Sequence, residues 1–582
     1  MKNYKKVYAA FILAGGLILH GCNGIFDDLA INPNQPSMGA YFTSPSAVND
    51  AVMTMYGYMS TQRCLGASGS KTTIIRSDEA SSNSDYGKPG MFGADLNASY
   101  YTIEQPYTLM YTTASQASYI IETAPSVDFS GNEEMRNAYM GEAYFWRAFA
   151  HYYLLINFRN ISPIRQMPRN GDDYVRPLEK PAAVWDFIQE DLAHAKELLP
   201  VKGYWDSKNA GRVTKASAAA LLGKAYLYRS GIEQYYGEDK TTFYSEAAKE
   251  FGDVIDGKYG TYDLTKNYAD NFDVAHENNE ESILEFQFLG DVDNAGFNPG
   301  LATSGLAFDS RGLMLPGAGV GYEGVVHNWL YNAFVNSVDK DGYTDIRMFS
   351  TMIFNDLDAS IHLRNDAGGN PVRLEGPGGY KWEELYPAKN GKEGFATVSN
   401  PLAHSFKAGI RKGIDCSMPT QTEADGTPKL VGVGAGVKEY VYNQPRAHGV
   451  NWRCIRFVDV LMMYAESVVS GGTPASNMTP LQAVNKVRGR ANMSELPSVT
   501  MADIQNERIL EFALEGHRFY DLLRWGKLAS RFTELQESDP NFKKFISADD
   551  FKGFVTNKHE WLPIPINEVN SNPYITENNP GY

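Results

Sequence analysis

The sequence predicts a mainly α-helical protein in which paired helices form a repeat-like scaffold and a loop-rich, irregular second half carries short strands. Three observations support this fold class. Apolar residues recur at three- and four-residue spacing in several long segments, which places them on one face of a helix. Small residues followed by aromatic residues recur in two helix pairs. The stretches between the helices are rich in Gly, Pro, Asn and Asp, which favour turns and loops.

The N-terminus has the pattern of a bacterial lipoprotein signal peptide. Three lysines precede an apolar run from Val7 to Leu19, which is shorter than the roughly 20 residues that a membrane-spanning helix needs. The run ends in Leu19-His20-Gly21-Cys22, which resembles a lipobox, where the chain is cut before a Cys that then carries lipid. We therefore expect a signal peptide over residues 1–21, lipidation of Cys22 and a tether over residues 22–43. An ordinary signal peptide is the alternative.

Residues 44–275 are expected to form a helical N-terminal region. Apolar residues at helical spacing predict helices over residues 44–61, 107–122, 135–158, 182–199, 214–230 and 247–255. Gly231 is expected to end the fifth of these helices. Residues 66–101 combine Ser, Asn, Gly and Asp with scattered aromatic residues, so we expect a long irregular loop there, and loops of that length are usually functional or disordered.

Residues 276–582 are expected to combine loops, short strands and returning helices. The segments 290–322 and 357–450 are rich in Gly, Pro, Asn and Asp, and short apolar alternations predict strands near residues 283–288 and 439–442. Helices are expected over residues 457–469, 480–490 and 502–525. The segment Leu562-Pro563-Ile564-Pro565 is incompatible with a helix.

Two of the predicted helix pairs indicate degenerate tetratricopeptide-like repeats. The small residue Gly223 and the aromatic Tyr226 are followed by Ala247 and Phe251 in the next helix, and residues 457–490 contain a second such pair. Small residues at these positions let two helices approach closely, while an aromatic ring fills the groove beside them.

The composition disfavours some partners. The chain has 582 residues with 53 Lys and Arg against 69 Asp and Glu, a formal net charge of −16. Nucleic-acid-binding proteins usually display clustered Lys and Arg, so nucleic acid is disfavoured. The 36 Tyr outnumber the 29 Phe, and a phenol-rich surface that stays partly in water is typical of proteins that recognise a ligand.

The acidic residues with the most enzyme-like spacing are better explained by structure. Glu507, Glu511 and Glu515 alternate with arginines at positions that let charges pair between helical turns, so we expect an ion-pair lattice there and no catalytic residue. Asp78 and Glu79 form the only acidic pair just before an aromatic loop. A glycoside hydrolase would need such a pair across a cleft, and this remains an alternative.

The sequence predicts neither a metal site nor a cofactor. Asp291, Asp293 and Asn294 could offer oxygen ligands to calcium, but the EF-hand pattern is absent and a solvated turn is favoured. The ten histidines lack ligand spacing, and the common nucleotide and hydrolase motifs are missing. Cys64, Cys416 and Cys454 are expected to be small buried residues.

The aromatic loops are the strongest candidates for ligand binding. A sugar ring stacks its C–H groups on an aromatic face, while its hydroxyls bond to polar side chains nearby. The loops at 66–101 and 290–322 contain both kinds of residue. The candidate ligand residues, chosen because polar residues flank them, are Tyr86, Phe92, Phe297, Phe308 and Tyr322.

Three strings in the C-terminal part of the sequence are specific enough to indicate a known family. They run from Arg456 to Glu466, from Ala483 to Arg490 and from Glu515 to Trp525. In these strings the chain resembles the SusD/RagB family of outer-membrane nutrient-binding lipoproteins. Residues 141–154 and 215–228 resemble the family's first helical repeats, and residues 561–565 resemble its closing segment. The resemblance covers nearly the whole mature chain and implies a scaffold of tetratricopeptide-like helix pairs that carries a loop-rich half.

The resemblance also implies a function. Family members have no catalytic activity, and they sit on the outer face of the outer membrane as the lid of a SusC-like TonB-dependent transporter that imports oligosaccharides or, in some members, peptides. We therefore expect a glycan-binding lipoprotein on the extracellular side, with such a transporter and an oligosaccharide or polysaccharide as partners. The alternatives are a peptide-binding member, a surface glycoside hydrolase and a protein that binds only partner chains.

Overall fold

The computed structural model describes most of the chain. The described residues are 42–61, 64–66, 69, 71–82, 92, 96–288, 323–376, 379, 381–386, 388, 390–394, 406–413, 430–432, 438–440, 450–539 and 554–582. The predicted mainly α-helical fold class is confirmed for this part of the chain. Among its helices, none combines the length and the apolar character needed to cross a bilayer.

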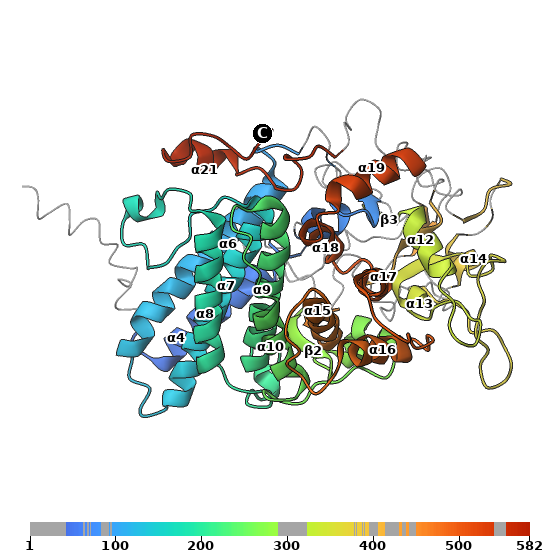
Figure 1. Ribbon diagram of the computed structural model, residues 1–582, viewed down its shortest axis with the longest axis horizontal. Helices are drawn as coiled ribbons and strands as arrows, with labels where there is room; N and C mark the ends of the chain where they lie inside the picture. The colour runs from blue at the N-terminus through green and yellow to red at the C-terminus, as the bar shows by residue number, and fades with distance from the viewer. Residues whose placement is uncertain are drawn as a thin grey trace, which may run out of the picture.

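A series of helices that pack side by side forms the first half of the molecule (Figure 1). Each helix packs against the next one along the chain, and α10 then packs against α15 of the second half. The series consists of α4 (Pro45–Met59), α6 (Tyr101–Thr123), α7 (Glu133–Phe158), α8 (Pro181–Leu198), α9 (Lys215–Tyr236) and α10 (Tyr244–Ile255).

Local sequence signals start these helices, and α7 provides much of their core. Ser44 caps α4 by accepting a hydrogen bond from the Ala47 backbone, with Pro45 in the first turn. In α7 almost every residue from Ala138 onward is buried. The Trp146 indole lies edge-on to Tyr56, with ring centroids 4.8 Å apart, which joins α7 to α4.

Gly231 does not end α9, contrary to the sequence-based expectation. The helix continues to Tyr236, and Gly231 lies where the helix touches the C-terminal part of the chain. A Cβ added at Gly231 would lie 2.6 Å from the carbonyl oxygen of Arg524. The glycine is therefore explained by a close approach of two backbones and not by helix termination.

The second half combines short helices with small sheets. The helices are α12 (Asn328–Val335), α13 (Arg347–Thr351), α14 (Trp382–Leu385), α15 (Phe457–Val469), α16 (Pro480–Arg490), α17 (Met501–Glu511), α18 (Arg518–Arg524), α19 (Leu528–Ser538) and α21 (Ile566–Ser571). Helices α15 and α16 have the predicted bounds and pack together as a pair. The segment 562–565 is not helical, as predicted.

The predicted helix over residues 502–525 is wrong as a single element. The chain forms α17 and α18 with a turn between them, in which Leu514 has φ 62° and Gly516 has φ 86°. The turn lets Lys412 donate from Nζ to the Ala513 carbonyl at 2.9 Å. This tertiary contact overrides the helical periodicity of the segment.

Eight short strands form three small antiparallel sheets within the described residues. The first sheet has the order β1-β3-β5-β4, and β2 pairs with β8 and β6 with β7 in the other two. The strands are β1 (Ala80–Ser82), β2 (Ser282–Phe286), β3 (Glu323–Val326), β4 (Met352–Phe354), β5 (Ala408–Ile410), β6 (Leu430–Gly432), β7 (Lys438–Tyr440) and β8 (Trp452–Arg456). Strands β2 and β7 correspond to the two predicted near residues 283–288 and 439–442.

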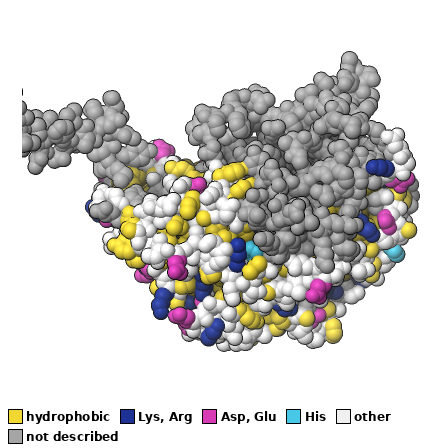
Figure 2. All heavy atoms as spheres, turned by 90° about the horizontal axis from the view of Figure 1, so that it is seen from above, with side chains coloured by type: hydrophobic (Ala, Val, Ile, Leu, Met, Phe, Trp, Pro, Cys, Tyr) yellow, Lys and Arg dark blue, Asp and Glu magenta, His cyan; other side chains and the backbone are white. Residues whose placement is uncertain are grey.

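The described surface carries charges of both signs. On the face drawn in Figure 2, the Lys and Arg side chains of the described residues are interspersed with Asp and Glu. Cys64 is buried, as expected, and burial raises the pKa of its thiol. Cys454 is half-buried, with a pKa raised to about 12 chiefly by desolvation. Cys416 lies outside the described residues.

Candidate ligand-loop base

The candidate ligand residues fall mostly outside the described part of the chain. Outside the described part lie Tyr86, Phe297, Phe308 and Tyr322, the predicted lipidation residue Cys22 and the calcium candidates Asp291, Asp293 and Asn294.

Phe92 is the one candidate ligand residue that the structure describes, and it is packed among other rings. Its side chain is 4% exposed. The ring stacks on His559 at 5.0 Å between centroids and lies edge-on to Phe532 and Phe554. In this position Phe92 contributes to the core, and its ring faces are covered by protein.

The prediction of one long irregular loop over residues 66–101 is wrong, because Ala80–Ser82 within it form β1, which pairs with β3 directly after the predicted loop 290–322. Strands β1 and β3 are antiparallel, and Ser82, the last residue of β1, is opposite Glu323, the first residue of β3. Along the chain, residue 83 directly follows this pair on one strand and residue 322 directly precedes it on the other. Tyr86 and Tyr322 are four residues and one residue away from this pair along the chain. We call the β1-β3-β5-β4 sheet, with the side chains that support it, the loop base.

Other predicted loop segments also begin or end next to the loop base or the β2–β8 sheet. Strand β5 pairs with β3 and follows residues 395–405. At the start of the 289–322 segment, the Phe288 backbone donates to Oδ1 of Asn451 at 2.6 Å, and Asn451 follows the segment 441–449. The segment 395–405 thus adjoins the loop base, while residues 289 and 449 adjoin the region of the β2–β8 sheet.

Asp78 fixes the loop base to the C-terminal helices. Its carboxylate accepts two hydrogen bonds from Arg518, at 2.9 and 3.0 Å, and one from Nε of Arg531 at 2.7 Å. Both guanidinium groups lie over the ring of Trp329, whose indole N–H donates to the Asp78 carbonyl. Burial would raise the pKa of Asp78, but the two arginines hold it below its usual value.

The neighbouring Glu79 is held in its neutral, protonated form. Its side chain is 2% exposed and accepts a hydrogen bond from the Leu514 backbone at 3.0 Å. Desolvation, together with the neighbouring Asp78 carboxylate, raises the pKa of Glu79 to about 8. At neutral pH the Glu79 carboxyl is therefore mostly protonated, while Asp78 is ionised.

In the observed arrangement, Asp78 and Glu79 have a structural role. Asp78 is 0% exposed and bound by two arginines, and Glu79 contacts Ser77 and the Leu514 backbone. A glycosidase pair would flank a substrate cleft with one carboxyl free to give a proton. The two carboxyl groups instead join β1 to the turn between α17 and α18.

The predicted ion-pair lattice is confirmed, and its charged side chains are buried in the protein. Glu511 is fully buried and is bound by Arg347, Arg456 and Arg490. Burial would raise the pKa of Glu511, but these arginines hold it well below its usual value. Arg456 also reaches Glu281, next to β2, at 2.5 Å. The lattice therefore ties the helices of the second half to the sheets.

The N-terminal and the C-terminal part of the chain each match a known protein family. Residues 422–582 match the family described as the SusD family, and residues 31–227 match the family described as starch-binding and associating with the outer membrane. The chain belongs to the SusD/RagB family. This is a glycan-binding family associated with the outer membrane at the cell surface.

Individual relatives of this SusD/RagB protein cover most of the chain. A SusD-like protein of Bacteroides ovatus is 24% identical over 533 residues, which are 90% of this chain and 83% of the relative. The crystal structure of a SusD superfamily protein from Bacteroides vulgatus is 21% identical with a TM-score of 0.66, covering 93% of this chain and 100% of that one.

A third similar protein is surface glycan-binding protein A from Bacteroides thetaiotaomicron, solved in complex with laminarihexaose. It is 18% identical with a TM-score of 0.66, and the match covers 92% of this chain and 100% of that one. At these identities the solved structures establish that this SusD/RagB protein has the SusD fold.

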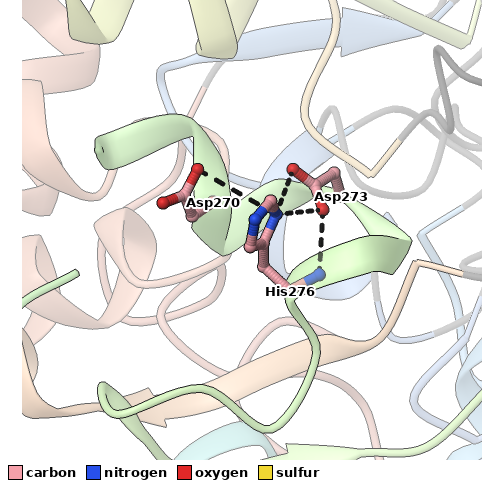
Figure 3. Close-up of side chains that lie close together, drawn as sticks. All are labelled: Asp270, Asp273 and His276. Atoms are coloured by element: carbon pink, nitrogen blue, oxygen red, sulfur yellow. Dashed lines mark hydrogen bonds and ion pairs between the residues drawn. The ribbon is translucent and has the colours of Figure 1, made fainter. Parts of the chain in front are cut away.

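One group of side chains in the described part of this SusD/RagB protein is spaced closely enough to hold a metal ion. Figure 3 shows His276 between Asp270 and Asp273. Nδ1 of His276 lies 2.8 Å from Asp273, and this hydrogen bond raises the pKa of the imidazole. Asp273 also accepts the backbone N–H groups of Ala275 and His276. These contacts account for the cluster as a capped turn.

Sequence reasoning missed a large groove on the helical scaffold. It has a volume of about 890 Å³ and is formed by α9, α10, α15, α17 and α18. Its lining includes Tyr235, in the part of α9 that was expected to lie beyond the helix. The available signal was the continued helical spacing past Gly231.

Proposed function

We propose that this SusD/RagB protein is a non-catalytic, lipid-anchored oligosaccharide-binding protein on the extracellular face of the outer membrane. It acts there as the lid of a SusC-like TonB-dependent transporter and delivers the oligosaccharide for import. The observation that carries the proposal is the pairing of Ser82 with Glu323, because the two segments that contain the proposed ligand residues adjoin this pair along the chain. Membership of a glycan-binding family supports the same function.

The loop base gives the proposed ligand residues a rigid origin. Tyr86 is four residues beyond Ser82 along the chain and Tyr322 directly precedes Glu323, and the pairing of Ser82 with Glu323 supports the proposal that the two tyrosines serve one ligand. Buried, charge-assisted hydrogen bonds of Asp78 with Arg518 and Arg531 hold the loop base in place next to β1. A rigid base lowers the entropy cost of ordering the loops around a sugar chain.

Calorimetric titration with soluble polysaccharides and oligosaccharides tests the binding function. We expect saturable binding of one glycan class in the range of about 1 μM to 1 mM. The double variant Tyr86→Ala, Tyr322→Ala should weaken this binding at least tenfold. Tyr574→Ala is the matched control, because Tyr574 is 59% exposed and lies outside the aromatic loops. Binding of peptide digests alone would assign the protein to the peptide-binding alternative.

Anchoring and import need separate experiments. Cys22→Ser should move the protein from the outer-membrane fraction to the soluble fraction, because the proposed lipid is attached to that thiol. Cells that lack the protein should lose growth on the glycan that it binds, and the wild-type chain should restore growth. Restored growth with the double loop variant would contradict the delivery role.

A further inference from the structure

The groove on the helical scaffold is separate from the loop base. Its lining residues belong to α9, α10, α15, α17 and α18 and the turns that follow them, and none of them comes from the β1-β3-β5-β4 sheet. Its volume of about 890 Å³ lies within the range of clefts that hold small organic ligands, roughly 300–1,000 Å³.

Tyr235 presents an exposed ring to this groove. The exposed aromatic side chains of the described residues include Tyr101, Tyr235 and Tyr574, and Tyr235 is 56% exposed. Tyr235 is the member of this group that lines the groove. An exposed ring inside a concavity is the usual stacking surface for a ligand with C–H faces.

The backbone at Gly526 holds the Tyr235 ring in place. A Cβ added at Gly526 would lie 2.5 Å from the ring, and Gly526 has φ 65°. Only glycine combines this backbone conformation with such a close approach without strain. The ring is therefore backed by the main chain on one side, while Tyr235 is 56% exposed, and this contact limits the freedom that the ring would lose on binding a ligand.

Polar side chains surround the ring. Gln234 and Glu246 line the groove from α9 and α10, and Lys527 donates to the Gln505 amide oxygen at 2.6 Å across its other wall. Trp525, which also lines the groove, is fixed by a 2.9 Å hydrogen bond from its indole N–H to Glu466. Hydrogen-bond donors and acceptors, among them one acidic and one basic side chain, thus surround the Tyr235 ring.

We propose that this groove is a second saccharide-binding site, which takes a short neutral oligosaccharide stacked on Tyr235. A sugar hydroxyl both donates and accepts, so it can bond to the amides of Gln234 and Gln505, to the Glu246 carboxylate and to the Lys527 ammonium group. A ligand of one charge sign would be repelled by either Glu246 or Lys527. This proposal is independent of whether the aromatic loops bind a sugar.

Calorimetric titration of the full-length protein with laminarihexaose, maltohexaose and xylohexaose tests this proposal. If both sites bind the same sugar, the wild type should show two binding events, and Tyr235→Ala should lose one of them. If the loop site binds none of these sugars, the wild type should show one event that Tyr235→Ala abolishes. Tyr235→Phe keeps the ring and should retain the groove binding within about threefold.

Tyr574→Ala is the matched control, because Tyr574 is 59% exposed and lies outside the groove. Circular dichroism should show unchanged helix content in all variants. Identical titrations for wild type and Tyr235→Ala, or no saturable binding of any of the three sugars by the wild type, would overturn the proposal. Binding of a peptide digest alone that Tyr235→Ala removes would replace the saccharide by a peptide.

Discussion

At the scale of single residues, the charged side chains of the C-terminal block form a buried structural lattice. Arg456 is 1% exposed and contacts Glu281, Glu511 and Glu515. The alternation of Glu and Arg in the sequence indicated this role, but the partners of Arg456 lie up to 175 positions away. Helical spacing reports only neighbours on the same helix, so it could not identify them.

Arg456→Met should destabilise the protein by about 3–5 kcal/mol, because it removes the shared partner of three buried carboxylates. Lys180→Met is the control, since the ion pair of Lys180 with Glu238 leaves the two side chains 82% and 90% exposed. That change should alter the free energy of unfolding by less than about 1 kcal/mol. Urea denaturation of both variants measures the difference, and equal losses would contradict a buried lattice.

Glu79 gives the protein a pH-dependent stability of predictable sign. Its folded pKa of about 8 lies above the ordinary value of 4.5, so between these values the folded chain binds a proton that the unfolded chain has released. Stability therefore falls as pH rises through this window, by at most about 1.4 kcal/mol per pH unit from this group. It levels off above the folded pKa.

Glu79→Gln should remove this contribution, because the amide keeps an acceptor for the Leu514 N–H without a titrating proton. The variant should gain stability relative to the wild type as pH rises from 5 to 8. Comparing the two proteins at each pH cancels the other titrating groups. A difference in unfolding free energy that stays constant over this range would show that Glu79 does not titrate as expected.

At the scale of elements, local signals predicted the helices well where packing agrees with them. The predicted bounds of α7, α8, α15 and α16 lie within two residues of those observed, because caps, prolines and apolar spacing coincide there. The break between α17 and α18 was missed, since it depends on contacts with Lys412 and Glu79. The β1–β3 pairing was also missed, because strands of three and four residues carry almost no periodic signal.

Two glycines inside helices should respond to alanine in opposite directions. Gly231→Ala places a Cβ 2.6 Å from the Arg524 carbonyl, so α9 and α18 must separate and stability should fall by about 1–3 kcal/mol. Gly489, in α16, has no atom within 4 Å of an added Cβ, so Gly489→Ala should stabilise by about 0.5–1 kcal/mol. Thermal unfolding measures both, and a stabilised Gly231→Ala would contradict the close approach.

At the scale of the whole molecule, hydrogen bonds join the C-terminal segment of the described chain to its N-terminal part. Arg76 donates to the carbonyls of His559 and Glu560 at 3.0 and 2.9 Å. The Leu562 N–H bonds to the Asn157 carbonyl at the end of α7. The Ile566 N–H, at the start of α21, bonds to the Ala98 carbonyl, and in Figure 1 this helix lies beside the top of α6. The helical half and the loop-rich half are therefore joined at both ends of the sequence.

Heat should unfold the protein in a single cooperative transition, because neither half keeps its buried contacts without the other. Strand β1 of the N-terminal region pairs with β3 of the C-terminal region, and α10 packs against α15. Far-ultraviolet circular dichroism and tryptophan fluorescence should give the same midpoint. Two transitions with separate midpoints would show that the halves are independent folding units.

The pairing of Ser82 with Glu323 also has a practical consequence for protein engineering. The position of this junction is set by buried residues, so changes in residues 83–91 and 289–322 should leave the helices in place. If the proposed function holds, a matched pair of segments from a known sugar receptor can be transplanted at this junction. The transplant should carry its specificity with it, provided that both segments are exchanged together and Asp78 with its arginines is left intact.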